Sequence, residues 1–478
     1  MAATAPDTTT PLCVDLDGTL ILSDLLLEST LRLIARNPLY LFMLPLWLLR
    51  GRAVLKAEVA ARVDLDPAAL PYDADLVHWL KSEQATGRSL WLCTAANEHL
   101  AGAVADHLGI FDGVLASDAG TNLAGHSKAQ RLVERFGERN FDYCGNERRD
   151  LAIWRHARGA VVVHGGRALE QQAARVAQVI AIFPPRQGRP RALLRALRPH
   201  QWAKNVLIFV PLLAAHRIGD FAALRAVLLA FAAFCLCASS VYILNDLLDL
   251  ESDRAHPRKS KRPFASGDAP VAAGLGLAPC LLAAATAIAL TLPSQFLLVF
   301  ATYYMLTLGY SIVLKGKLLI DTLTLAGLYT LRIVAGAAAA AVPLSFWLLL
   351  FSVFLFLSLA FVKRYAELDS LRRQGKLRAA GRNYHVEDLS ILRSLGTAAG
   401  YLSVLVLALY INSPDVQMLY HHPKVIWLLC IAMLYWISRI WIVAERGWLH
   451  DDPVVYALKD RMSLLTGLVV ALTIIVAV

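Results

Sequence analysis

Acidic side chains in the stretch NDLLDLESD, residues 245–253, have the types and the spacing to hold a metal ion. Asp246, Asp249 and Asp253 stand at positions i, i+3 and i+7, which share one face of a helix. Three carboxylates on one face repel each other, and an oxygen-ligated Mg²⁺ shared with substrate phosphates would relieve that repulsion. Basic residues that could contact phosphates directly follow at once: Arg254, Arg258, Lys259, Lys261 and Arg262. The pattern predicts a site for Mg²⁺ and a phosphorylated substrate.

A second pattern with chemical potential lies near the N-terminus, in LCVDLDGTL, residues 12–20. An apolar run typical of a buried strand ends in Asp15 and Asp17, and Gly18 permits the tight turn that follows. Three later stretches, 89–96, 126–137 and 141–154, contribute further residues at a strand end or a helix start: Thr94, Lys128, Gly145, Asn146 and Asp150. Alternation of strands with helical stretches predicts a parallel, doubly wound α/β sheet.

Long apolar runs surround the acidic stretch 245–253 and predict that it lies at a membrane. Hydrophobic residues make up 57% of the 478-residue chain, against about 45–50% in soluble proteins, and the excess begins near residue 204. A membrane span needs about 20 mostly apolar residues. Nine segments are candidates, of which the first and the seventh are short: 204–218, 221–244, 271–292, 296–314, 318–341, 344–362, 395–411, 423–444 and 461–478. The C-terminal part is therefore predicted to be an all-α polytopic membrane domain.

The net charge of +10 is distributed between these apolar runs. Every second loop is basic, and the loops HRIGD, LPSQ, AVP and NSPDVQMLYHHPK are nearly free of bases. This alternation places the basic loops and the N-terminal domain in the cytoplasm, on the inner face of the plasma membrane. It also argues against nucleic-acid binding, because membrane topology accounts for the bases. The seven cysteines are scattered without CxxC or zinc-ligand spacing, and no secretory signal begins the chain.

The acidic motif within this apolar context resembles the UbiA superfamily of intramembrane prenyltransferases, over residues 195–478. The resemblance implies nine helices around a cavity open to lipid, with Mg²⁺ holding a diphosphate on the first acidic motif. The second acidic motif of that family, DxxxD, is missing. Lys363, Arg364 and Glu367 stand where acids are expected. A second Mg²⁺–diphosphate clamp is therefore not predicted, and a cationic site for another phosphate is more natural.

Four stretches in order, RPHQWAKN, NDLLDLESDRAHPRKSKRP, YSIVLKGKLLID and KRYAEL, resemble the decaprenyl-phosphate phosphoribosyltransferase subgroup. Members of that subgroup transfer ribose 5-phosphate from phosphoribosyl diphosphate to a polyprenyl phosphate. The resemblance implies that Lys204 and Lys315 contact donor phosphates and that Lys363 and Arg364 contact the lipid phosphate. Asp321 would help to orient the ribose. The remaining predicted substrate-binding residues are Asn245, Arg254, Arg258, Lys261, Arg262, Tyr310 and Glu367. For the lysines at helix ends, snorkelling to the interface is the alternative explanation.

The N-terminal motifs resemble those of haloacid dehalogenase (HAD) phosphatases, in the order of that family. The resemblance implies that Asp15 attacks phosphorus, that Asp17 donates and accepts a proton, and that Thr94 hydrogen-bonds the phosphate. Lys128 would balance the charge of nucleophile and phosphate. Mg²⁺ ligands would be Asp15, the carbonyl of Asp17, Asp150 and the amide oxygen of Asn146, which stands where a second acid is usual. An inactive phosphatase fold is the alternative.

Two segments of the N-terminal part have no role in these motifs. An insert at about 22–85 contains LYLFMLPLWLL, residues 39–49, which is too short to span and is interrupted by Pro45. It is either a helix buried in a cap over the phosphatase core or an interfacial hairpin that contacts the bilayer. Residues 184–198 form a basic linker, in which Pro and Gly are expected to break regular structure. The predicted domains are thus 1–183, the linker, and 199–478.

Together these patterns predict a bifunctional membrane enzyme. The membrane domain would make polyprenyl-phosphoryl ribose 5-phosphate, and the phosphatase domain would remove the 5-phosphate, both at the cytoplasmic face and both with Mg²⁺. One alternative is prenyl transfer from a prenyl diphosphate to an aromatic or other acceptor, with an independent phosphatase. Another is a non-catalytic lipid-binding or regulatory protein. The sequence leaves open the lipid chain length, the pentose and whether the chain forms a homo-oligomer.

Overall fold

The computed structural model describes residues 10–118, 120–186, 188–378, 382–413, 420–449 and 452–477. The chain divides into two compact units. The first unit combines Met1–Leu197 with Tyr242–Ala278, so it contains the N-terminal domain and the segment that carries the acidic motif. The second unit combines Arg198–Val241 with Pro279–Val478. The acidic motif thus belongs to the same compact unit as the predicted phosphatase.

A six-stranded parallel sheet forms the centre of the first unit, in the order β3-β2-β1-β4-β5-β6. The strands are β1 (Leu12–Val14), β2 (Leu90–Asn97), β3 (Gly113–Ser117), β4 (Asp142–Gly145), β5 (Gly159–Val163) and β6 (Gln178–Phe183). Sequence order reverses at β1, which pairs with β2 on one side and β4 on the other. Open parallel sheets bind ligands outside the carboxyl ends of the strands at such a switch point. The predicted doubly wound α/β sheet is confirmed.

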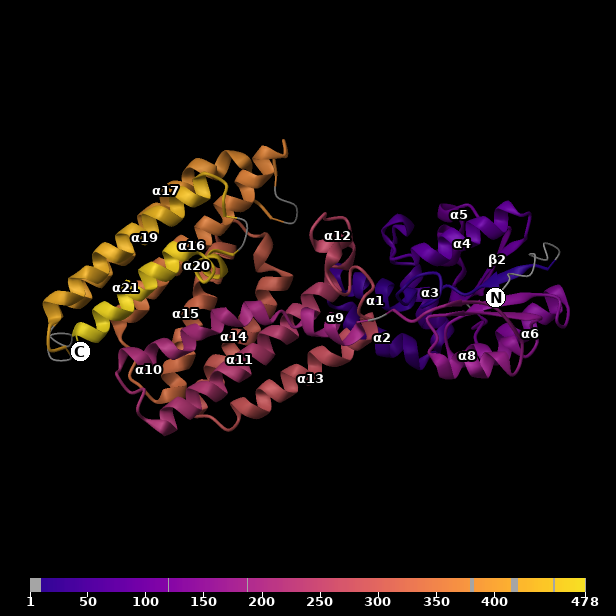
Figure 1. Ribbon diagram of the computed structural model, residues 1–478, viewed down its shortest axis with the longest axis horizontal. Helices are drawn as coiled ribbons and strands as arrows, with labels where there is room; N and C mark the ends of the chain where they lie inside the picture. The colour runs from indigo at the N-terminus through magenta and orange to yellow at the C-terminus, as the bar shows by residue number, and fades with distance from the viewer. Residues whose placement is uncertain are drawn as a thin grey trace. The chain divides into compact units, whose positions relative to one another are not determined.

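Helices cover both faces of this sheet, with α4 and α5 over one and α6 and α8 over the other (Figure 1). Side chains alternate between the faces of a strand, so Leu12 and Val14 pack into one buried cluster while Cys13 packs into the other. The helices outside the insert are α5 (Glu98–Leu108), α6 (His126–Phe136), α7 (Leu151–Trp154) and α8 (Arg167–Ala174), with the short helix η2 (Arg148–Asp150).

The insert between β1 and β2 is helical. It consists of α1 (Leu25–Arg36), α2 (Tyr40–Leu49), α3 (Arg52–Ala60), η1 (Pro67–Ala69) and α4 (Ala74–Ala85). Asp24 begins α1 by accepting a hydrogen bond from the backbone N–H of Leu27, at 2.9 Å, and Asp73 caps α4 in the same way. Trp47 of α2, Leu33 of α1 and Val59 of α3 share a small hydrophobic cluster.

The predicted linker is more ordered than its composition suggested. Helix α9 (Arg189–Ala196) occupies most of it. The expectation of broken structure was wrong because Pro190 lies in the first turn, where the missing N–H has no intrahelical partner in any case.

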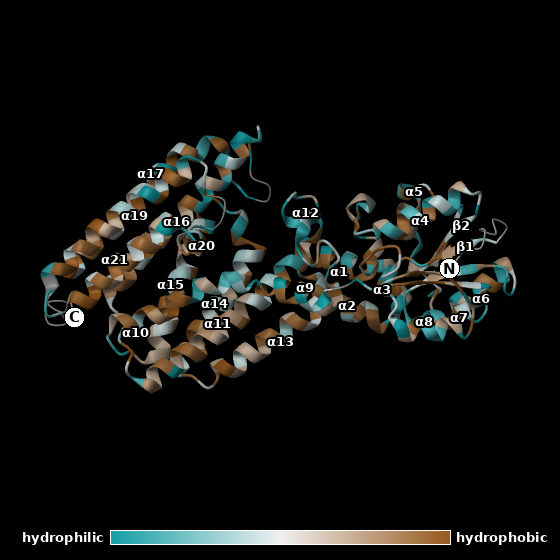
Figure 2. Cartoon of the chain, in the orientation of Figure 1, coloured by the Kyte–Doolittle hydropathy of each residue, from teal (hydrophilic) through white to brown (hydrophobic). Residues whose placement is uncertain are grey.

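Seven helices in the described part of the chain are long and apolar enough to cross a membrane, which indicates a multi-pass membrane protein. Their apolar character is visible along α11, α13 and α19 in Figure 2. The helices are α11 (Phe221–Leu248), α13 (Val271–Ala289), α14 (Ser294–Ile312), α15 (Ile320–Ala340), α16 (Phe346–Arg373), α17 (Leu389–Ile411) and α19 (Trp427–Glu445). Short helices connect or flank them: α12 (Leu250–Arg254), η4 (Lys259–Lys261), η5 (Leu314–Gly316), η6 (Val386–Asp388), η7 (Pro423–Ile426) and α20 (Pro453–Ala457).

The prediction of nine spans was wrong for the first and the last segment. Residues 204–218 form the 3-10 helix η3 (Pro199–Phe209) and the five-residue α10 (Val210–Ala214). Pro211 lies at the start of α10, and His216, with φ of 53°, follows its end. The last segment forms α21 (Arg461–Ala477), whose 17 residues extend about 25 Å, less than the roughly 30 Å hydrocarbon core.

Candidate active sites

The predicted phosphatase residues meet at the carboxyl edge of the parallel sheet. Asp15 follows β1, Thr94 lies inside β2, three residues before the strand ends, and Asp150 follows β4. The Lys128 ammonium reaches this edge from α6 and donates to Asp15 Oδ1 at 2.9 Å and to the hydroxyl of Tyr143 at 3.0 Å. Lys128 and Asp15 are both buried. A buried carboxylate thus has a cation beside it, as a nucleophile that attacks an anionic phosphate requires.

Asp17 is held in the same loop by a hydrogen bond to the start of α1. Its Oδ1 accepts the backbone N–H of Leu25, at 2.7 Å, at the start of α1. Burial and the neighbouring charge of Asp24 raise the pKa of Asp17 to about 8, against the lowering effect of that hydrogen bond. Asp17 therefore carries a proton near neutral pH, which suits a group that protonates a leaving oxygen.

Asp150 and Asn146 complete the edge. Asp150 Oδ2 accepts the backbone N–H groups of Asn146 and Glu147, at 2.8 and 2.9 Å. Burial and the charge of Asp15 raise the pKa of Asp150 to about 7. The Asn146 amide lies over Gly18, where any side chain on Gly18 would meet it. Gly18 also has a positive φ of 69°, so both space and backbone favour glycine there.

Oxygen donors of this edge fit a hard divalent cation. Asp15 and Asp150 supply carboxylates and Asn146 an amide oxygen, which are the ligand types that Mg²⁺ prefers. In the described ranges of the chain, no group of three His, Cys, Asp or Glu side chains is arranged to hold a metal ion. The predicted ligand set contains two carboxylates, with the Asp17 backbone carbonyl and the Asn146 amide as the other donors.

In the acidic motif, Asp246 near the end of α11 and Asp253 in α12 converge on one guanidinium. Arg262 Nη1 lies 3.1 Å from Asp246 Oδ1 and 2.5 Å from Asp253 Oδ2. Both carboxyl groups are buried, and the other oxygen of Asp253 is buried without a hydrogen-bond partner. Burial raises the pKa of Asp253, although Arg262 opposes that effect. The unbonded oxygen of Asp253 and the nearby carboxyl group of Asp246 are suited to bind a cation between them.

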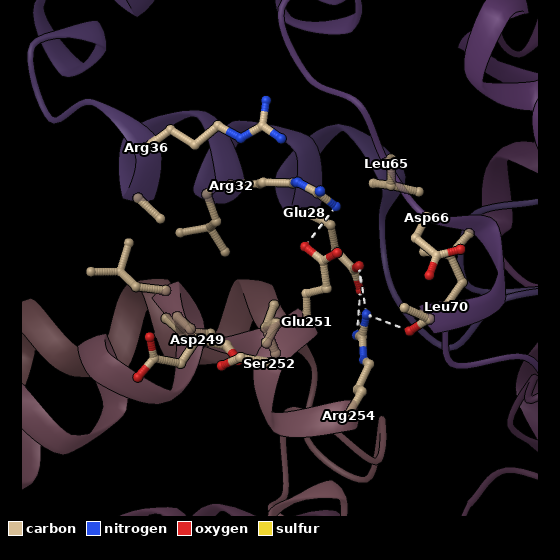
Figure 3. A pocket seen from close by; sticks show the side chains of 16 residues that line it. Glu28, Arg32, Arg36, Leu65, Asp66, Leu70, Asp249, Glu251, Ser252 and Arg254 are labelled. Carbon is tan, nitrogen blue, oxygen red and sulfur yellow. Dashed lines mark hydrogen bonds and ion pairs between the residues drawn. The ribbon is translucent and has the colours of Figure 1, made fainter. Parts of the chain in front are cut away.

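Asp249 lies between α11 and α12 and lines a cavity of about 270 Å³. Its carboxylate points away from the two ion pairs that cross the cavity wall (Figure 3). In those pairs Arg254 donates to Glu28 of α1, at 2.6 and 2.8 Å, and Arg32 of α1 lies 2.6 Å from Glu251. Arg254, predicted to bind substrate phosphate, is thus engaged with the insert. Arg258 and Lys261 are exposed, and the backbone carbonyl of Asn245 accepts from Asp249.

In the second unit two predicted lysines meet at one carboxylate. Lys204 of η3 and Lys363 of α16 both donate to Asp452 Oδ2, at 2.8 and 3.0 Å. Tyr329 donates its hydroxyl to the other oxygen of Asp452, at 3.0 Å. Burial alone would raise the pKa of Asp452, but the charges and hydrogen bonds of the two lysines outweigh it and lower that pKa.

Arg364 belongs to a different cluster from Lys363, because consecutive helical residues point in different directions. Its Nε lies 2.5 Å from Asp321 of α15, and its other nitrogens donate to Glu367, at 2.5 Å, and to Tyr310, at 3.0 Å. Tyr384 also donates to Asp321, at 2.6 Å. Lys315 lies in η5, partly exposed. The predicted set is therefore divided between two clusters. Lys204 and Lys363 share Asp452 and keep one net positive charge, whereas Arg364 is balanced by Asp321 and Glu367.

Sequence reasoning missed three of the residues that organise these sites. Asp452 follows the last of the seven spans and precedes Pro453, where it caps α20 by accepting from the N–H of Val454 at 3.2 Å. An acid directly before a proline between two apolar runs is a helix-start signal that could have drawn attention to it. Glu28 and Tyr143 carry no such local signal, because their partners lie more than a dozen residues away in the chain.

The fold and the clusters define a polytopic membrane protein with an α/β domain that presents acidic and cationic side chains at a sheet edge. Residues 206–465 match the UbiA prenyltransferase family, and this chain belongs to that family. It is 38% identical over 470 residues to the uncharacterized protein y4nM of Sinorhizobium fredii, covering 98% of this chain and 91% of that one. It is 35% identical to decaprenyl-phosphate phosphoribosyltransferase of Mycolicibacterium smegmatis, covering 58% of this chain and 91% of the other. A UbiA homolog from Archaeoglobus fulgidus bound to DMAPP and Mg²⁺ aligns at 16% identity and a TM-score of 0.47, over 60% of this chain and 98% of its own.

Proposed function

We propose that this protein transfers 5-phosphoribosyl from phosphoribosyl diphosphate to a polyprenyl phosphate, and then removes the 5-phosphate. The observation that carries the first step is the 35% identity to a decaprenyl-phosphate phosphoribosyltransferase over 91% of that protein. In this step an oxygen of the lipid phosphate forms a bond to C1 of the ribose. The C1–oxygen bond to diphosphate breaks, and diphosphate leaves.

Side chains of the acidic motif suit the donor. Asp246 and Asp253 would hold Mg²⁺, which neutralises charge that develops on the leaving diphosphate. The lipid phosphate is already ionised at neutral pH, so its attack needs no strong base. The lipid phosphate must instead be held in position. Lys204, Lys363 and Asp452 together carry one net positive charge, which can bind it. We therefore assign Lys204 and Lys363 to one and the same substrate phosphate, rather than to two substrates.

The second step uses the sheet-edge residues of the α/β domain. Asp15 would attack the phosphorus of the 5-phosphate while Asp17 gives its proton to the departing ribose oxygen. A water then hydrolyses the phospho-aspartyl group and returns a proton to Asp17, and inorganic phosphate is released. Lys128 stabilises the negative charge throughout, because it lies 2.9 Å from Asp15. The product is polyprenyl-phosphoryl ribose, made at the cytoplasmic face, where we place both sites.

The test uses the full-length protein in lipid nanodiscs with Mg²⁺, labelled phosphoribosyl diphosphate and polyprenyl phosphate. We expect the parent to form the dephosphorylated lipid, Asp15→Asn to accumulate the lipid-linked 5-phosphate, and Asp246→Asn to form neither. Asp64→Asn, a change at an exposed acid of the same domain, should match the parent. Mass spectrometry distinguishes the products. A parent that makes no ribosylated lipid refutes the transferase, and an Asp15→Asn variant that still yields the dephosphorylated lipid refutes the coupling.

A further inference from the structure

Helix α2 of the insert has more exposed apolar surface than its packing explains. Its packing face consists of Tyr40, Leu44 and Trp47, spaced i, i+4 and i+7, which contact the cluster around Leu33 and Val59. The remaining apolar side chains of α2 are 40–84% exposed: Leu41, Phe42, Met43, Leu46, Leu48 and Leu49. A contiguous exposed patch of this kind marks an interaction surface.

The charges beside α2 indicate what covers this surface. Arg36 precedes the helix and Arg50 and Arg52 follow it, and all three are exposed. No acidic residue occurs between Glu28 and Glu58. A short apolar helix with flanking arginines suits the boundary between acyl chains and anionic headgroups, where each nearby basic residue contributes about 1 kcal/mol.

Helix α2 is also held near a membrane-crossing helix. It packs on α1, whose buried Glu28 forms an ion pair with the partly buried Arg254 of α12. Helix α12 begins at Leu250, directly after α11 ends at Leu248. The exposed face therefore lies on an element tied to the end of a span. With ten residues, about 15 Å in length, and Pro45 inside it, α2 is too short to cross a core of roughly 30 Å itself.

We infer that α2 is a monotopic anchor, inserted into the headgroup region of the leaflet next to the end of α11. The buried-cap alternative from the sequence does not fit, because only Trp47 of α2 is fully buried. An anchor of this kind keeps the α/β domain at the membrane surface, where a phosphorylated lipid headgroup is presented. The inference stands independently of the proposed reactions, since it rests on exposure, charge and connectivity.

The test places an NBD fluorophore on α2 in the full-length protein. The label is attached to Phe42→Cys in a Cys280→Ser background, because the other native cysteines are buried. Nanodiscs of phosphatidylcholine and phosphatidylglycerol contain one chain each, with or without nitroxide-labelled lipid. The control label is at Glu134→Cys, an exposed position on α6.

We expect the nitroxide lipid to quench the label at residue 42 at least twofold and to leave the label at residue 134 unchanged, while aqueous iodide quenches only residue 134. A label at Leu49→Cys should repeat the result for residue 42 and guards against a local effect of one substitution. Iodide quenching at residue 42 equal to that at residue 134 would overturn the anchor. Shielding from iodide that appears only when discs contain two chains would assign the surface to a second copy instead, and would equally overturn it.

Discussion

Replacing Asp17 by asparagine removes the titratable proton of this side chain and keeps its size and shape. The amide oxygen of the new side chain can still accept the N–H of Leu25, which Asp17 Oδ1 accepts at 2.7 Å. The variant cannot give a proton to a leaving group. We expect phosphatase activity to fall by about 10²- to 10⁴-fold, the usual contribution of a general acid, at every pH tested. Transferase activity should not change.

The same substitution should stabilise the α/β domain at high pH. The pKa of Asp17 is about 8 in the folded protein and about 4 in an unfolded chain. The folded state therefore keeps a proton that the unfolded state has lost, and the stability contributed by that proton is lost as pH rises through 8. Between pH 5 and pH 8 the loss in the free energy of unfolding is roughly 4 kcal/mol for a fully buried group. Solvent reaches the partly exposed side chain of Asp17, so we expect a loss of about 2–3 kcal/mol. The substituted amide has no proton to lose, so the variant gains relative to the parent.

Hydrogen–deuterium exchange of the full-length protein in Mg²⁺-free nanodiscs measures this difference at the peptide that contains the Leu25 amide. We expect parent and Asp17→Asn to exchange at similar rates at pH 5, after correction for intrinsic exchange. At pH 8.5 the parent should be the less protected of the two by one to two orders of magnitude. Equal protection at both pH values would refute the assignment of a raised pKa to Asp17. Retained phosphatase activity would refute its role as the acid.

Two further substitutions test local geometry. Gly18→Ala should destabilise the loop by about 1–2 kcal/mol, because alanine disfavours the positive φ of 69°. It should also reduce phosphatase activity, because the added methyl group displaces the Asn146 amide. Unchanged thermal stability and turnover would contradict this prediction. Glu28→Gln leaves Arg254, whose side chain is only 10% exposed, without its countercharge and should cost about 3 kcal/mol, seen as faster proteolysis in α1. The matched change Glu251→Gln, at a more exposed pair, should cost less than about 1 kcal/mol; equal effects of the two changes would show that burial does not set their strength.

Much of the architecture follows from local patterns in the sequence. The alternation of apolar strands and helices predicted the parallel sheet, and the motif order predicted which strand ends carry Asp15, Thr94 and Asp150. This works because the carboxyl ends of parallel strands share one edge, so topology converts sequence order into proximity. Hydropathy found all seven membrane helices of the described ranges. It overcounted at residues 204–218 and 461–478, because apolar composition does not register Pro211 or a helix a few residues too short.

Pairings between residues far apart in the chain became visible only in three dimensions. Local patterns indicated that Lys204 and Lys363 are cations near helix ends, and that Arg254 follows an acidic motif. They could not show that both lysines meet Asp452, or that Arg254 binds Glu28 across 226 residues. Nor could they show whether α2 is buried or exposed, since an apolar sequence is compatible with both a protein core and a membrane surface. Hydrophobic periodicity reports on one element at a time, whereas the partner of a buried charge depends on how distant elements pack.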